Sequence, residues 1–138
     1  MTRPPSDVVD QLVAVADRMR RRAYAPYSRF RVGAAILAGG KVYRGANIEN
    51  ASYPLSVCAE RNAAAAAVLA GHREFQVVAV VADNDDPTPP CGGCRQVLNE
   101  FGPRMLVVCQ GAGGRRAEWV LPAILPHAFG PHDLLDER

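Results

Sequence analysis

The chain has 138 residues, of which 49% are hydrophobic and 22% are charged. These values are typical of a single folded domain over residues 1–138 and exclude a largely disordered chain. The net charge of +2 is too small for a surface that coats nucleic acid, and no apolar run is long enough to span a membrane. Since the N-terminal residues lack the apolar core of a signal peptide, we expect a cytoplasmic protein.

The first expected element is an amphipathic helix over residues 7–22, because apolar side chains recur there along one stripe. Ser6 is expected to cap its start. The basic cluster "RMRRR" falls at its carbonyl end, where cations complement the helix dipole. The segments "FRVGAAIL" and "KVYRGANIE" flank the turn "AGG", so they predict two antiparallel strands.

A second helix is expected over about residues 57–70, ended by Gly71. Its alanine run favours helix and is apolar on every side, which predicts a helix buried all round. The valine-rich runs at 75–82 and 105–109 are typical of strands covered on both faces of a parallel sheet.

A third helix is expected between these two strands, in "CGGCRQVLNEFGP", and a short final helix in "AEWVLPAIL". Four strands and four helices in this order predict an α/β fold. The expected architecture is a three-layer α/β/α sandwich around one mixed sheet.

Cysteines mark the starts of two of these helices: Cys58 opens one, and Cys91 and Cys94 open the other. Helices that leave the same end of a sheet bring their N-termini together, so the three thiols can converge. Three protein ligands leave one position of a tetrahedral zinc ion open to water, as in catalytic sites. The sequence therefore predicts a zinc site.

Glu60 lies two residues after Cys58 and could take a proton from a zinc-bound water and deliver it to a leaving group. Residues two apart in a helix point nearly opposite ways, so the pair can meet only if Cys58 lies at the first turn. Three thiolates leave the site negatively charged. Two helix N-termini and Arg61 could offset this charge, the latter by donating hydrogen bonds to a thiolate.

Each feature also has a simpler interpretation. The Cys-x-x-Cys pair alone could be a thioredoxin-like redox motif. Cys109 could be the fourth ligand of a closed structural site, although its position in an apolar strand favours an inert buried thiol. Glu60 could be a first-turn carboxylate favoured by the helix dipole. The combination of Cys58, Glu60 and the Pro90 that precedes Cys91 favours zinc.

The pattern Cys-Ala-Glu followed by Pro-Cys-x-x-Cys is similar to the signature of zinc-dependent deaminases. Four blocks in order resemble the small, single-domain, homotetrameric cytidine deaminases: "YAPYSRFRVGAA", "GANIENASYPLSVCAERNA", "PCGGCRQVLNEFGP" and "LPHAFGPHDL". Their resemblance implies a five-stranded mixed sheet and a homotetramer with active sites at subunit interfaces. It also implies one Zn²⁺ per subunit, held by Cys58, Cys91 and Cys94.

The same resemblance implies hydrolysis of cytidine and deoxycytidine to uridine and deoxyuridine, with release of ammonia, in pyrimidine salvage. A zinc-activated water would attack C4 of cytosine while Glu60 protonates N3 and then the departing amine. Further implied substrate-binding residues are Asn47 and Glu49 for the sugar, Ala59 through its backbone N–H for the base carbonyl, Phe30 beside the base, Phe129 stacking on it from a neighbouring subunit, and Ala51 and Tyr53 reaching a neighbour's sugar.

Alternatives remain for several of these residues. Phe30 and Tyr53 could be core packing residues, Asn47 a strand-end residue, and Glu49 a solvated carboxylate. Arg31 departs from the family, because many relatives carry proline at that position.

Rival functions are deamination of a modified cytosine nucleoside, as in blasticidin-type deaminases, and a non-catalytic zinc-stabilised module. The intact "NIENASY" block argues against the first. Polynucleotide deaminases typically carry His-Ala-Glu where this chain has Cys-Ala-Glu, so we expect a small nucleoside as substrate, with neither nucleic acid nor membrane as partner.

Overall fold

One five-stranded sheet, in the order β2-β1-β3-β4-β5, organises the computed structural model, which describes residues 3–135. Strands β3 and β4 are parallel and the other neighbours are antiparallel, so the sheet is mixed as expected. The elements are α1 (Ser6–Arg20), β1 (Val32–Ala38), β2 (Lys41–Ala46), α2 (Ala59–Leu69), β3 (Phe75–Ala82), α3 (Gly92–Phe101), β4 (Leu106–Gly111), β5 (Arg116–Val120) and α4 (Leu121–Ile124), with short 3₁₀ turns at Tyr53–Leu55 and Pro131–Asp133.

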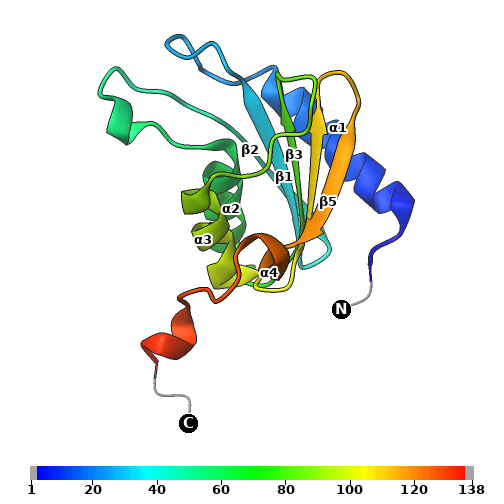
Figure 1. The fold of residues 1–138 in the computed structure, drawn as a ribbon, viewed down its shortest axis with the longest axis vertical. Coiled ribbons are helices and arrows are strands. Elements are labelled where there is room, and N and C mark those ends of the chain that lie inside the picture. Colours follow the sequence, from blue (N-terminus) through cyan, green and yellow to red (C-terminus); the bar gives the residue numbers. More distant parts are fainter. Residues whose placement is uncertain (1–2, 136–138) are drawn as a thin grey trace.

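Helices cover both faces of the sheet, which confirms the three-layer sandwich (Figure 1). Successive side chains of a strand point to opposite faces. In β3, Val77, Ala79 and Val81 therefore pack with α1, while Val78 and Val80 pack with α2 and α3. This explains why the run 75–82 is apolar without interruption.

The fifth strand, β5, is where the element prediction was wrong. Residues 116–120 pair with β4, Ala117 opposite Cys109 and Trp119 opposite Val107. Within β5 only Ala117 and Trp119 are partly buried, because alternate side chains point to opposite faces and one face of this strand is covered. Such a short alternating segment is easily taken for part of the helix that follows, which is only Leu121–Ile124.

The alanine-rich helix α2 is buried on one face, not all round. Ala63, Ala64 and Ala67 pack on the sheet, whereas Leu69 is 89% exposed. The first helix differs in detail, because Pro5 occupies its N-cap and the Ser6 side chain makes no capping hydrogen bond.

Strand β2 approaches α2 so closely that Gly45 has no room for a side chain. A Cβ at this position would lie 2.5 Å from the carbonyl oxygen of Ala59 and 2.6 Å from the backbone nitrogen of Ala63. Asn62 adds a hydrogen bond of 2.8 Å to the carbonyl oxygen of Ala46. The first turns of α2 are thus held directly against the sheet.

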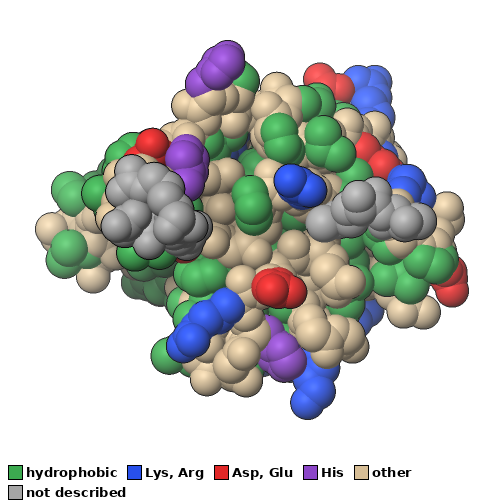
Figure 2. Space-filling model, turned by 90° about the horizontal axis from the view of Figure 1, so that it is seen from below, with side chains coloured by type: hydrophobic (Ala, Val, Ile, Leu, Met, Phe, Trp, Pro, Cys, Tyr) green, Lys and Arg blue, Asp and Glu red, His purple; other side chains and the backbone are tan. Residues whose placement is uncertain are grey.

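The start of β1 and the ends of β2 and β3 lie at one edge of the sheet, since Val32 pairs with Ala82 and Gly33 with Ala46. The helices α2 and α3 begin after these strand ends. Among the described residues no helix is long and apolar enough to cross a bilayer. On the face drawn in Figure 2, acidic and basic side chains are scattered among apolar ones and no basic stripe forms.

Candidate active site

Three cysteines converge where α2 and α3 begin. The Sγ atoms of Cys58, Cys91 and Cys94 all lie within 4.8 Å of one another. Cys58 is the N-cap of α2 and Cys91 the N-cap of α3, and the Cys91 sulfur accepts the Cys94 backbone N–H at 3.5 Å. This confirms the prediction that the three thiols converge where two helices begin at the same end of the sheet.

The donor set fits zinc. Zinc–sulfur bonds of about 2.3 Å in a tetrahedron place the sulfurs about 3.8 Å apart, which the cluster reaches with a small contraction. Within residues 3–135, Cys109 is not part of the cluster. It is fully buried on β4, where burial raises the pKa of its thiol to about 12. The closed site with four thiolates is therefore not supported, and a zinc ion held by the three cysteines would keep a fourth position for water.

The thiols influence one another strongly. Hydrogen bonds from Cys94 and Cys91, together with the charge of Arg61, lower the pKa of Cys58 to about 6. The pKa of Cys94 is raised instead, first by its hydrogen bond to Cys58 and then by burial. The protein alone thus favours the thiolate of Cys58 and opposes that of Cys94, and a bound cation would favour both thiolates.

Glu60 is buried beside this cluster, with 5% of its surface exposed. Burial raises its pKa to about 7, and the negative charge of Cys58 adds to this. Cys58 has an extended backbone, with φ −69° and ψ 155°, because it precedes the first helical residue. For that reason the two side chains can line the same cavity although they are two residues apart.

Arg61 is exposed at the start of α2. Its charge contributes to the lowered pKa of Cys58, after the two cysteine hydrogen bonds. Among the described residues no hydrogen bond joins Arg61 to a cysteine sulfur. The direct contact inferred from the sequence therefore stays a prediction.

A cavity of about 410 Å³ opens onto the cluster. Nine of the residues singled out in the sequence line it: Phe30, Asn47, Glu49, Tyr53, Cys58, Ala59, Glu60, Cys91 and Cys94. Three others do not: Ala51, Arg61 and Phe129. The sequence did not indicate Ser28, Val32, Ser56, Val57, Val80, Thr88 and Pro89, which line it as well.

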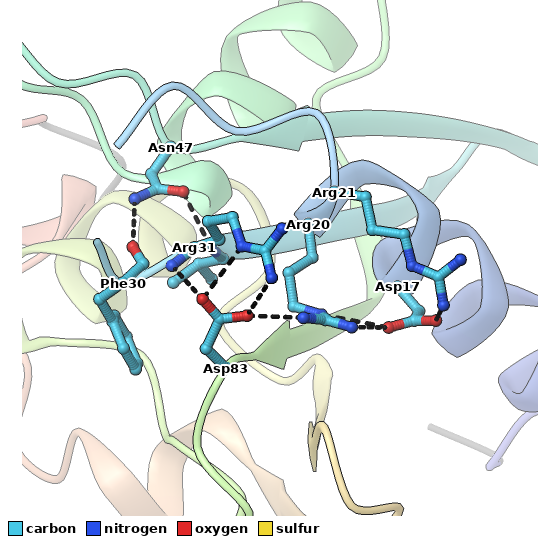
Figure 3. A network of polar contacts seen from close by, with 8 residues as sticks. Asp17, Arg20, Arg21, Phe30, Arg31, Asn47 and Asp83 are labelled. Atoms are coloured by element: carbon cyan, nitrogen blue, oxygen red, sulfur yellow. Dashed lines mark hydrogen bonds and ion pairs between the residues drawn. The ribbon is translucent and has the colours of Figure 1, made fainter. Parts of the chain in front are cut away.

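Asn47 joins the cavity wall to the start of β1. Its Oδ1 accepts the backbone N–H of Val32 at 2.8 Å, and its Nδ2 donates to the carbonyl oxygen of Phe30 at 2.8 Å (Figure 3). Asn47 therefore does hold the backbone at a strand end, and it also lines the cavity. One hydrogen of Nδ2 and the second lone pair of Oδ1 remain for a ligand.

Glu49 is buried rather than solvated, with 8% of its surface exposed. Its carboxylate accepts the backbone N–H groups of Tyr27 at 3.0 Å and Ser28 at 3.1 Å, and the hydroxyl of Ser28. These bonds, the hydroxyl first, lower the pKa of Glu49. Ser28 carried no signal in the sequence, because its partner lies 21 residues away.

Arg31 has a partner at the end of β3 (Figure 3). Asp83 Oδ2 accepts the backbone N–H of Arg31 at 2.9 Å and its Nε at 3.2 Å. The other oxygen of Asp83 accepts Nη1 of Arg20 at 2.5 Å, and Arg20 also binds Asp17. This network fixes the backbone at Arg31, directly after Phe30. Arg29, on the other side of Phe30, has a left-handed φ of 58°.

Phe129 is 58% exposed, and its carbonyl oxygen accepts Nε2 of Gln96 at 2.8 Å. Ala51 is exposed in the loop before α2. The structure therefore leaves both residues outside the cavity of their own chain, and their roles toward a neighbouring subunit stay predictions.

Comparisons with known proteins agree with this site. Residues 7–110 match the family described as "Cytidine and deoxycytidylate deaminase zinc-binding region". Curated relatives named cytidine deaminase are 46% identical in Sporosarcina psychrophila, over 91% of this chain and 94% of that one, and 49% identical in Halalkalibacterium halodurans, over 91% and 96%.

A crystal structure of cytidine deaminase from Burkholderia pseudomallei superposes with a TM-score of 0.84 at 45% identity, covering 87% of this chain and 98% of that one. This likeness confirms the α/β fold, and the family match together with the cysteine cluster assigns zinc as the cofactor. The chain belongs to the zinc-dependent cytidine and deoxycytidylate deaminase family.

Proposed function

We propose that Cys58, Cys91 and Cys94 hold one zinc ion and that Glu60 carries protons in the hydrolysis of cytidine to uridine and ammonia. The observation that carries this proposal is the pairing of a buried carboxyl, whose pKa is raised to about 7, with a cluster of three thiols on one cavity. Cytidine deaminases at 46% and 49% identity support cytidine as the substrate. We propose that residues 1–138 act as one catalytic domain.

When bound, the zinc ion supplies an electrophile that activates water beside C4 of the base. Glu60 in its ionised form accepts the first proton of that water and delivers it to N3 of cytosine, while the water oxygen forms a bond to C4. It then transfers the second proton to the amine at C4, the C4–N bond breaks, and ammonia leaves. Burial of Glu60 suits both steps, because a pKa raised above the ordinary carboxyl value makes the protonated group a readier donor to the amine, while the ionised group still accepts a proton.

The cavity offers groups for each part of a nucleoside. The backbone N–H of Ala59, at the first position of α2, has no partner within its helix and would donate to the base carbonyl. Phe30 would pack against the base, while Asn47 and Glu49 would bind sugar hydroxyls.

Glu49 has about one acceptor position left of roughly four, because three donors already bind its carboxylate. One position suffices for one hydroxyl. We therefore include deoxycytidine in the proposal, since both sugars offer the 3′-hydroxyl.

Assembly and location belong to the proposal as well. We propose a cytoplasmic homotetramer in which Ala51 and Phe129 reach the cavity of a neighbouring subunit, and in which Tyr53, which also lines the cavity of its own chain, reaches a neighbour's sugar. The exposure of Tyr53, at 61%, and of Phe129, at 58%, supports such a contact. Light scattering that showed a fully active monomer would contradict it.

The decisive experiment follows the ultraviolet absorbance of cytidine and the release of ammonia in one sample of zinc-loaded protein. Equal loss of cytidine and gain of ammonia are expected. Glu60→Gln should keep one zinc per chain and lose turnover. Retained turnover in this variant would overturn the role of Glu60, and zinc-loaded wild-type protein without turnover would overturn the proposed substrate.

A further inference from the structure

Arg95 follows the cluster residue Cys94, and its guanidinium joins two segments far apart in the sequence. Its Nε donates to the carbonyl oxygen of Pro90 at 2.7 Å, and its Nη1 donates to the carbonyl oxygen of Ile124 at 2.8 Å. Pro90 is buried and directly precedes Cys91, whereas Ile124 ends α4. Arg95 thus links the approach to one cysteine with the C-terminal part of the chain.

The first of these bonds bears on the geometry of the cluster. Cys91 is the N-cap of α3, so the orientation of the Pro90–Cys91 peptide sets the direction in which the Cys91 side chain leaves the backbone. The Pro90 carbonyl lies outside the helix and is not part of its hydrogen-bond ladder. The guanidinium of Arg95 holds this carbonyl in place from within the same helix.

The second bond is one of several between α3 and the segment 124–129. Nε2 of Gln96 donates to the carbonyl oxygen of Phe129 at 2.8 Å, and Nδ2 of Asn99 donates to the same oxygen at 3.5 Å. Both ends of the segment therefore rest on α3, the helix that also carries Cys94.

The pair of carbonyls explains why arginine suits this position. A guanidinium has five N–H donors in a fixed plane and can bind two carbonyl groups at once from different nitrogens. Lysine carries one ammonium on a flexible stem. A lysine at position 95 could replace one of the two hydrogen bonds, but it could not hold the carbonyls of Pro90 and Ile124 at a fixed position relative to each other.

We propose that Arg95 is a positioning residue that holds the Cys91 ligand and the segment 124–129 in one geometry, so that loss of zinc and loosening of this segment occur together. The inference rests on the proposed function in one respect, namely that zinc is the ion bound by the cluster.

The test compares zinc-loaded wild-type chain with Arg95→Met, Arg95→Lys and the control Arg18→Met. Arg18 is an exposed residue of α1, on the opposite face of the sheet. Release of zinc to an excess of a coloured chelator should be about 10-fold to 100-fold faster in Arg95→Met, because groups that orient metal ligands typically contribute that factor to metal affinity and we expect the loss in the release rate. Arg95→Lys should lie between this variant and wild type, and the control should match wild type.

Two further readouts separate positioning from a general loss of stability. Cobalt-substituted Arg95→Met should show shifted absorption bands, because these bands report the arrangement of the thiolates. Hydrogen exchange should rise in both 86–94 and 121–130, while α1 keeps its protection. If Arg95→Met does not fold, Arg95→Lys carries the same measurements.

Wild-type release rates and an unchanged cobalt spectrum in Arg95→Met would overturn the inference. Release from Arg95→Lys at the wild-type rate would also overturn it, since one bond would then suffice. Faster exchange in 86–94 alone would overturn the link to the C-terminal segment. A wild-type chain that binds no zinc would instead overturn the proposed function.

Discussion

The hydroxyl of Ser28 donates a hydrogen bond to the buried carboxylate of Glu49, and the backbone N–H of the same serine binds the other oxygen. The bond from the hydroxyl is the largest cause of the lowered pKa of Glu49. Ser28 thus both orients and stabilises the negative charge of Glu49, the residue that we propose binds the sugar.

Ser28→Ala removes this hydroxyl and leaves the two backbone donors in place. We expect KM for cytidine to rise about tenfold with kcat nearly unchanged, because the carboxylate becomes less well oriented and the chemical step does not involve it. Steady-state kinetics of the zinc-loaded variant measure both constants. A fall in kcat with constant KM would contradict the assignment of Glu49 to substrate binding.

The acidic side of the pH profile reports Glu60. Burial raises the pKa of this carboxyl from 4.5 to about 7, so protonation removes the base as the pH falls. The charge of bound zinc acts in the opposite direction, and we expect kcat/KM to fall with a midpoint between these two values. A profile that stays flat down to pH 4.5 would contradict Glu60 as the base.

The same pKa shift affects the stability of the metal-free chain. The folded pKa of Glu60 lies above that of the unfolded chain, so ionisation opposes folding as the pH rises through the range from 4.5 to about 7. We expect metal-free Glu60→Gln to be more stable than wild type at pH 8, by up to about 3 kcal/mol, and equal below pH 4. Urea unfolding at the two pH values checks this, and equal stability at pH 8 would contradict it.

Cys109 provides a test of the number of zinc ligands. It is fully buried and does not belong to the cluster, so Cys109→Ala should keep one zinc per chain and lose about 1 kcal/mol of stability from the missing sulfur. The matched change Cys58→Ala should lose the zinc. Metal analysis of both purified variants decides, and loss of zinc from Cys109→Ala would restore the closed four-thiolate site.

Asp83 provides a test of the network behind Phe30. Asp83→Asn weakens the charge-assisted bonds to Arg20 and Arg31, and we expect the free energy of unfolding to fall by about 1–3 kcal/mol. The control is Asp86→Asn, because its ion pair with Arg115 is exposed at 72% and 74% and contributes little. Urea titrations of both variants give the comparison, and equal losses would contradict the structural importance of this network.

The layers of the fold could be predicted because their signals are local. The valine runs of β3 and β4 and the stripe of α1 each follow from neighbouring residues. β5 could not be predicted in the same way, since its five residues alternate on a single covered face and its pairing with β4 is a tertiary contact.

The metal site could be predicted from chain order, whereas its supports could not. Cys58, Cys91 and Cys94 could be recognised as candidate ligands because they lie at the starts of two predicted helices. Ser28 and Asp83 act through partners 21 and 52 residues away, and no pattern in one sequence connects such pairs. The placement of Cys58 and Glu60 on one cavity required the backbone angles of the N-cap residue.

The contact between Gly45 and α2 makes the proton carrier sensitive to a position outside the cavity. An alanine at 45 would press on the carbonyl of Ala59 and the amide of Ala63, and the first turn of the helix would have to lift from the sheet. Glu60 and the ligand Cys58 would move with that turn, while Cys91 and Cys94, on another helix, would stay. A single methyl group in a strand would thus displace the acid–base group and one metal ligand together, and would produce the kinetic defect of an active-site mutation although no residue of the active site is changed.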